Sequence, residues 1–138
     1  MGRIRSVHPD QWTDADFDSC PHLARLLALA VRNVADDNGM FPWKSQELRW
    51  QLLPADDCDV AELLSELESS GQIVRFEADG RAFGMVRNFT RYQSPCMPTF
   101  KYPPPAGETL ARFRVHEEYR NALARVAGVG GGPRPRLS

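Results

Sequence analysis

Apolar residues recur at helical spacing in three segments of the first half of the chain. Residues spaced i, i+3, i+4 and i+7 fall on one face of an α-helix, and that face can be buried against a core. The spacing therefore predicts helices over residues 21–35, 45–53 and 60–70. Their apolar faces consist of Leu23, Leu26, Leu27, Ala30, Val31 and Val34 in the first helix, Leu48, Leu52 and Leu53 in the second, and Val60, Leu63, Leu64 and Leu67 in the third.

The residues at the ends of these segments are typical of helix termini. Ser19 is predicted to cap the first helix, because a serine hydroxyl can accept from an unpaired N–H of the first turn. Asp59, with Glu62 three residues later, forms a capping-box pattern before the third helix. Gly71 can adopt the positive φ with which helices commonly end, so it predicts the end of that helix.

An extended pattern replaces the helical one at two places. Residues 40–42, Met-Phe-Pro, are short and apolar, and they predict an edge strand because proline cannot donate to a sheet ladder. Residues 73–77 and 82–87 are rich in β-branched and aromatic side chains and flank a turn that contains Asp79-Gly80. This combination predicts a β-hairpin.

The predicted order is therefore helix, short strand, helix, helix and hairpin, which is the order of an α+β winged helix-turn-helix. We assign this domain to residues 1–90. Residues 91–106 are predicted to form an extended strap, because five prolines between positions 95 and 105 are incompatible with regular helix. Residues 107–127 predict a C-terminal extension helix with a narrow apolar stripe that includes Tyr119, and residues 128–138 predict a flexible basic tail.

The composition limits the classes of protein to be considered. Hydrophobic residues make up 42% and charged residues 25% of the 138 positions, as in soluble globular proteins. The longest apolar run, residues 26–31, is far shorter than the roughly 20 residues of a membrane-spanning helix, and the N-terminus lacks the apolar stretch of a signal peptide. Three cysteines without a C-x-x-C pair argue against a disulfide framework or zinc ribbon and favour a reducing cytoplasm. We therefore expect no membrane partner.

The net charge of −1 hides a strong asymmetry along the chain. From Asp10 to Glu68 there are thirteen acidic and four basic residues, a net charge of −9. From Ser69 to Ser138 there are eleven basic and five acidic residues, a net charge of +6, and Arg3 and Arg5 add two further positive charges. Such asymmetry indicates that the two parts of the chain have different partners.

Short motifs follow one another in a particular order between residues 3 and 95. They are Ile4-Arg5, Pro9, Trp12, Ala35-Asp36-Asp37-x-Gly39, Pro54-Ala55-Asp56-Asp57, Gly71-x-Ile73-Val74, Asn88-Phe89 and Gln93. As an ordered set, these motifs resemble the N-terminal winged-helix domain of phage replication-initiation or replisome-organiser-like proteins, a family that includes small phage and prophage proteins. The resemblance implies a cytoplasmic protein of a bacterial host cell that binds DNA and acts in DNA replication or its regulation, with a host or phage replication protein as a further partner.

The third predicted helix argues against the usual use of a winged helix, in which this helix enters the major groove. Six acidic residues and no basic residue lie between Asp56 and Gly71. Because duplex DNA is densely negative, such a helix would be repelled from the groove. Two interpretations stay open: the acids form a solvated face, or the helix binds a basic protein partner through residues such as Glu62 and Glu66.

The hairpin and its flanks are the better candidates for contact with DNA. They carry basic residues interleaved with aromatic ones, and guanidinium groups can bind phosphates while rings stack on bases. Alternatively, the aromatic residues belong to the core and the basic residues are ordinary solvated side chains. The candidate DNA-binding residues are Arg75, Arg81, Arg87, Arg91 and Lys101, with Arg3 and Arg5 as a minor-groove arm.

The sequence carries no enzyme signature. No phosphate-binding glycine loop, G-x-S-x-G or H-E-x-x-H motif occurs, so we expect no catalytic residues, no cofactor and no metal. Residues 36–39, Asp-Asp-Asn-Gly, are interpreted as a turn, because the later ligands of a calcium loop are lacking. The alternative to DNA binding is an adaptor or transcriptional regulator in which the winged helix is a scaffold, with Glu62, Glu66 and Tyr119 binding a protein partner or a second subunit of a homodimer.

Overall fold

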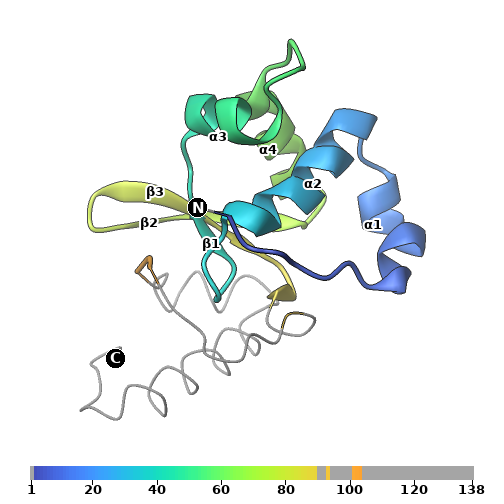
Figure 1. Ribbon diagram of the computed structural model, residues 1–138, viewed down its shortest axis with the longest axis horizontal. Helices are drawn as coiled ribbons and strands as arrows, with labels where there is room; N and C mark the ends of the chain where they lie inside the picture. The colour runs from blue at the N-terminus through green and yellow to red at the C-terminus, as the bar shows by residue number, and fades with distance from the viewer. Residues whose placement is uncertain (1, 90–92, 94–100, 104–138) are drawn as a thin grey trace.

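A computed structural model of the chain describes residues 2–89, 93 and 101–103 (Figure 1). The predicted alternation of helices and strands in the first 90 residues is confirmed, and the three predicted helices are each found to within two residues of their predicted ends. The elements are a 3-10 helix η1 (Pro9–Thr13), helices α1 (Ala15–Asp18), α2 (His22–Val34), α3 (Ser45–Leu52) and α4 (Val60–Ser69), and strands β1 (Met40–Pro42), β2 (Ile73–Ala78) and β3 (Arg81–Val86). The predicted C-terminal helix and tail lie outside the described residues, as does most of the predicted strap.

The three strands form an antiparallel sheet in the order β1-β3-β2. Among the strands of the described residues, β1 pairs with β3 alone and stands at the edge of the sheet, as predicted. The β2–β3 turn has positive φ at Asp79 (54°) and Gly80 (75°), as a tight two-residue hairpin turn requires. Figure 1 shows α2, α3 and α4 together on one side of the sheet and the hairpin turn projecting away from the helices.

Both faces of the sheet are apolar. On the inner face, Phe41, Ile73 and Val86 pack with the buried residues of α2 and α4 in the main core. On the outer face, a second buried cluster contains Phe76 and Phe83, whose rings stack with centroids 5.7 Å apart. Tyr102 covers part of this second cluster, its ring centroid lying 5.7 Å from that of Phe83. The segment after the hairpin therefore returns to the outer face of the sheet.

The start of the chain differs from the prediction. Ser19 does not cap α2; it ends α1, where its hydroxyl donates to the carbonyl oxygen of Asp16 at 2.7 Å. Pro21 is the N-cap residue of α2, which begins without a side-chain cap. The two helical turns before α2 were not predicted, because five and four residues are too few to show a helical period. They place Phe17 in the main core, where it is 1% exposed.

The predicted ends of α4 are confirmed. The Asp59 carboxylate accepts from the backbone N–H of Ala61 at 3.1 Å, which satisfies one of the unpaired donors of the first turn. Gly71 follows the helix with a φ of 82°. All four apolar residues predicted to face the core from this helix are buried. The exposed side of α4 therefore consists of Ala61 and the acidic and serine residues.

We predict that Gly84→Ala destabilises the domain by about 1–3 kcal/mol, as overpacking in a well-packed core does. A Cβ atom at position 84 would lie 2.3 Å from the Cζ atom of Phe41, on the strand that pairs with β3. Urea denaturation measures the change in the free energy of unfolding. In a double-mutant cycle with Phe41→Leu, the Gly84→Ala cost should shrink, whereas strictly additive costs would contradict the clash.

Candidate nucleic-acid interface

The side chains of the turn at residues 36–39 bind both the N-terminal segment and the segment at residues 101–102. Asp36, Asp37 and Asn38 are 4%, 1% and 5% exposed, which is unusual for polar residues in a turn. The Asp36 carboxylate accepts four backbone N–H groups: those of Asn38 (2.9 Å) and Met40 (3.0 Å) on Oδ1, and those of Lys101 (3.0 Å) and Tyr102 (3.2 Å) on Oδ2. One side chain thus closes its own turn and fixes a segment that lies 65 residues later.

Asp37 holds the N-terminal segment against the same turn. Its Oδ1 atom accepts from Arg5 at 2.9 Å and its Oδ2 atom from Arg3 at 2.5 Å. The Arg5 guanidinium also donates to three backbone carbonyls at the end of α2 and lies over the Phe89 ring, 4.9 Å from its centroid. Its side chain is only 5% exposed. In this structure the Arg5 guanidinium is therefore held inside the domain and is not presented at the surface as a minor-groove arm.

Arg75 and Arg81 lie near the hairpin turn and on opposite faces of the sheet. Arg75 is paired with Gly84 across the strands, on the inner face, and its guanidinium lies 5.8 Å from the ring centroid of Trp43 and 3.5 Å from the Glu77 carboxylate. Arg81 is on the outer face, over the Phe83 ring at 5.1 Å. Both side chains are exposed. The hairpin end therefore presents a guanidinium on each side.

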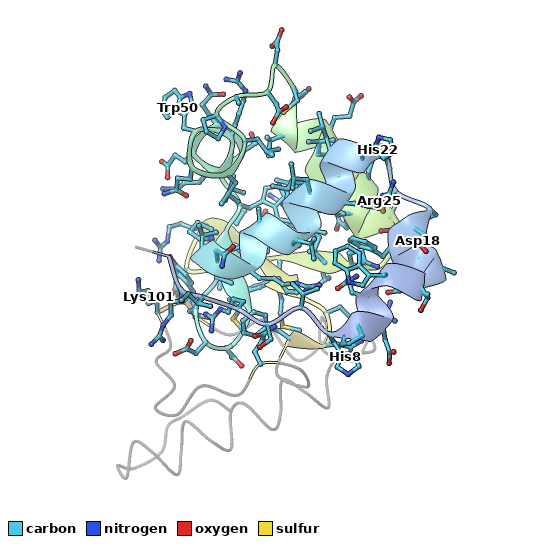
Figure 2. All side chains as sticks on the ribbon, turned by 45° about the vertical axis from the view of Figure 1, so that its right-hand side comes forward. His8, Asp18, His22, Arg25, Trp50 and Lys101 are labelled. Carbon is cyan, nitrogen blue, oxygen red and sulfur yellow. The ribbon has the colours of Figure 1, made fainter. Side chains whose placement is uncertain are left out.

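A groove of about 440 Å³ lies between the end of β1 and α3. Lys44, Lys101 and Tyr102 line it together with Glu47 of α3, whose carboxylate lies 3.9 Å from the Lys44 ammonium. Lys44 follows Trp43, whose backbone N–H donates to the carbonyl of Ala82 in β3 at 3.0 Å. We call the basic and aromatic side chains of the hairpin end and this groove the hairpin-end surface: Trp43, Lys44, Arg75, Arg81, Lys101 and Tyr102. Trp50, on α3, is 63% exposed, and Figure 2 shows it well above Lys101.

The other predicted DNA-binding residues are not part of the hairpin-end surface. Arg87 lies at the opposite end of β3, where its Nη1 atom is 3.3 Å from the carbonyl oxygen of Gly71 and 3.9 Å from the Asp16 carboxylate. Arg3 is 48% exposed but is paired with Asp37. Arg91 lies outside the described residues. The structure therefore brings together Arg75, Arg81 and Lys101 of the predicted set.

The predicted protein-binding residues of α4 lie on a different face. Glu62 is exposed and Glu66 is half-buried, and both line a shallow depression between α4 and the corner before α2, with Ser65 and Ser69. The Oε1 atom of Glu66 is buried without a hydrogen-bond partner. Tyr119 lies outside the described residues. The acidic face of α4 and the hairpin-end surface therefore consist of different residues, and the hairpin-end surface carries basic side chains together with the acids Glu47, Glu77 and Asp79.

Sequence reasoning missed Trp43, Lys44 and Trp50. Lys44 was counted within the acidic half of the chain, and no pattern marked Trp43 as a neighbour of the hairpin or Trp50 as exposed. The available signal is that residues 43–44 directly follow the strand that was predicted to pair in the sheet, which places them beside the hairpin. The sequence therefore contained the position of Lys44 and Trp43, but not the exposure of Trp50.

The described part of the chain contains neither a metal-binding cluster nor a membrane-spanning helix. No group of three histidine, cysteine, aspartate or glutamate side chains is arranged there to hold a metal ion. Nor does any helix among those residues have the length and apolar character needed to cross a membrane.

The different roles of Arg5 and Arg3 give a matched pair of variants. We predict that Arg5→Ala destabilises the domain by about 3–5 kcal/mol, because the buried Asp37 carboxylate loses its buried ion-pair partner and keeps the half-exposed Arg3. Arg3→Ala should cost at most about 1 kcal/mol, because its side chain is half exposed. Chemical denaturation of both variants checks this difference, and equal costs would contradict it.

Asp36 gives a prediction about pH. Burial raises its pKa above the ordinary value of 3.8, more than its four backbone N–H donors lower it. Between 3.8 and the raised pKa, the folded protein binds a proton that the unfolded chain has lost, so the contribution of Asp36 to stability falls as the pH rises. The free energy of unfolding of the wild type minus that of Asp36→Asn should therefore decrease through this range in urea denaturation. An increase would show that the N–H donors dominate.

The chain was compared with protein families, curated proteins and solved structures. No protein-family model, curated protein or solved structure matches the chain significantly. Its function is therefore inferred from the placement, exposure and charge of its own side chains.

Proposed function

We propose that this protein is a winged-helix DNA-binding protein of phage or prophage origin that acts in DNA replication or its regulation. The order α2, β1, α3, α4, β2, β3 and the sheet order β1-β3-β2 are those expected of a winged helix, with the β2–β3 hairpin as the wing. The phage and replication parts of the proposal rest on the sequence resemblance. The DNA-binding part rests on the hairpin-end surface.

The single observation that carries the proposal is the exposure of guanidinium groups on both sides of the hairpin turn. Arg75 and Arg81 project from opposite faces of the same two strands. A hairpin of this kind can lie along a phosphate backbone and bind phosphates on either side of its axis. Lys44 and Lys101 add positive charges in the groove between the end of β1 and α3.

The charge distribution also favours contact through the hairpin rather than through α4. The exposed side of α4 carries Glu62 and Glu68, and no basic residue lies on this helix. Placing it in a groove would bring carboxylates to phosphates without releasing counterions. In the proposed binding mode, the hairpin-end surface faces the DNA and α4 faces away from it.

The exposed ring of Trp50 suggests that bases are contacted as well as phosphates. Trp50 is 63% exposed, whereas the half-buried Trp43 ring is already covered by Arg75 and by Phe41, with which it stacks at a centroid distance of 6.1 Å. Exposed aromatic rings beside basic groups are typical of proteins that bind unpaired bases. We therefore expect forked or single-stranded DNA to bind at least as well as duplex DNA of the same length.

Fluorescence anisotropy with labelled duplex, forked and single-stranded DNA tests this function. The double variant Arg75→Gln/Arg81→Gln should bind roughly tenfold or more weakly at low salt, and the slope of log K against log salt on duplex should fall by about 1.8, because two phosphate contacts are lost. Arg25→Gln, on α2, removes one positive charge and is the matched control for the single variants Arg75→Gln and Arg81→Gln, which also remove one each.

Two results would contradict the proposal. One is the absence of binding to all three DNA forms at low ionic strength. The other is an equal loss of affinity in the Arg25 control and in a single hairpin variant, which would indicate a nonspecific effect of net charge.

A further inference from the structure

A second polar pocket lies away from the hairpin-end surface, between η1 and the end of β3 that is farthest from the hairpin turn. Its volume is about 260 Å³, and its lining includes Gln11, Arg32, Gln72, Arg87 and Asn88. These residues come from four separate parts of the chain: η1, α2, the start of β2 and the end of β3. The pocket is therefore a product of the tertiary fold and of no single motif.

Arg32 is the most unusual residue of this pocket. Its guanidinium is half-buried, and the hydrogen bond that it makes is to the Oε1 atom of Gln11, which is uncharged. No carboxylate in the described part of the chain lies within ion-pair distance of it. A guanidinium has five N–H donors, and a bond to one neutral acceptor leaves donors that can bind an anion in the pocket that Arg32 lines. Removing such a charge from water without an anion is costly, so the site is incomplete as it stands.

Arg87 brings a second guanidinium to the same pocket. Its Nη1 atom has only a weak contact with the Asp16 carboxylate, at 3.9 Å, and a 3.3 Å hydrogen bond to the Gly71 carbonyl. The side-chain amides of Gln72 and Asn88 can supply further N–H donors. The backbone of Asn88 has a φ of 59°, a left-handed conformation that asparagine tolerates and most residues avoid.

The acidic residues at the pocket do not neutralise these guanidinium groups. The Asp10 side chain is 81% exposed, and its carboxylate lies 3.6 Å from His8 at the surface. The Asp14 carboxylate accepts from the backbone N–H of Asp16 at the start of α1. Neither carboxylate is within 4.0 Å of a guanidinium of Arg32 or Arg87, since no such ion pair occurs in this part of the structure.

We propose that this pocket binds a phosphate group, held by the guanidinium groups of Arg32 and Arg87 and by the neighbouring amides. Planar guanidinium groups form paired, charge-assisted hydrogen bonds to phosphate oxygens. The volume lies below the roughly 300–1,000 Å³ of pockets that take drug-sized ligands, so it suits a phosphate group and not a whole nucleotide. The phosphate belongs either to a nucleic acid or to free phosphate or a small phosphate ester.

NMR titration of the full chain with inorganic phosphate, against chloride at matched ionic strength, tests the proposal. Phosphate, but not chloride, should shift the Nε–H signals of Arg32 and Arg87 and the side-chain amide signals of Gln72 and Asn88. Arg32→Gln should raise the phosphate Kd roughly tenfold or more, because a charge-assisted pair is lost. Arg87→Gln provides a second variant on a separate strand, and Arg25→Gln, elsewhere on α2, should leave the Kd within about twofold.

The same experiment distinguishes the two sources of the phosphate group. If a short oligonucleotide shifts the same signals and competes with inorganic phosphate, the site binds nucleic-acid phosphate. If phosphate still binds at a saturating oligonucleotide concentration, the site takes free phosphate or a small ester. Equal shifts with chloride, or phosphate shifts that persist in both folded arginine variants, would overturn the proposal. These outcomes are independent of the hairpin-end surface, because neither Arg75 nor Arg81 lines this pocket.

Discussion

The buried carboxylates of Asp36 and Asp37 are the interaction on which the rest of the structure depends. Asp36 is 4% exposed and Asp37 is 1% exposed. Their carboxylates need hydrogen-bond donors or positive charges beside them, because a buried unpaired carboxylate is very unfavourable. Backbone N–H groups from residues 38, 40, 101 and 102 compensate Asp36, and the N-terminal arginines compensate Asp37. The need to satisfy these oxygens therefore joins the two sequence-distant segments that flank the helical core.

This arrangement also determines which basic residues can meet a ligand. Arg5 forms an ion pair with Asp37, and its side chain is buried. Lys101 is bound to Asp36 through its backbone N–H, so its side chain stays exposed. The acids of α4 stay on the opposite side of the helical layer. The acidic face of α4 and the hairpin-end surface thus consist of different residues.

Much of the fold could be predicted from the sequence because its periods are strong. The helical spacing of α2 and α4, the Asp59 cap and the Asp-Gly hairpin turn depend on residues close together in the chain, and these elements are confirmed. The predicted core face of α2 is wrong in part, because Leu26 is 48% exposed and Ala24 and Ala28 are buried beside Leu27 and Val31. The short helical turns before α2 could not be predicted, since a single turn shows no period. The role of Ser19 was misjudged because a capping residue can serve either of two adjacent helices.

The sequence by itself determined the elements, their order and the negative charge of α4, because these are properties of contiguous residues. Only the tertiary structure decided which arginines are available. Arg5 is buried against Asp37, Arg75 and Arg81 flank the hairpin, and Arg32 faces a pocket closed by β3. The environment of a charge depends on groups brought together from distant positions, and composition carries no record of that proximity.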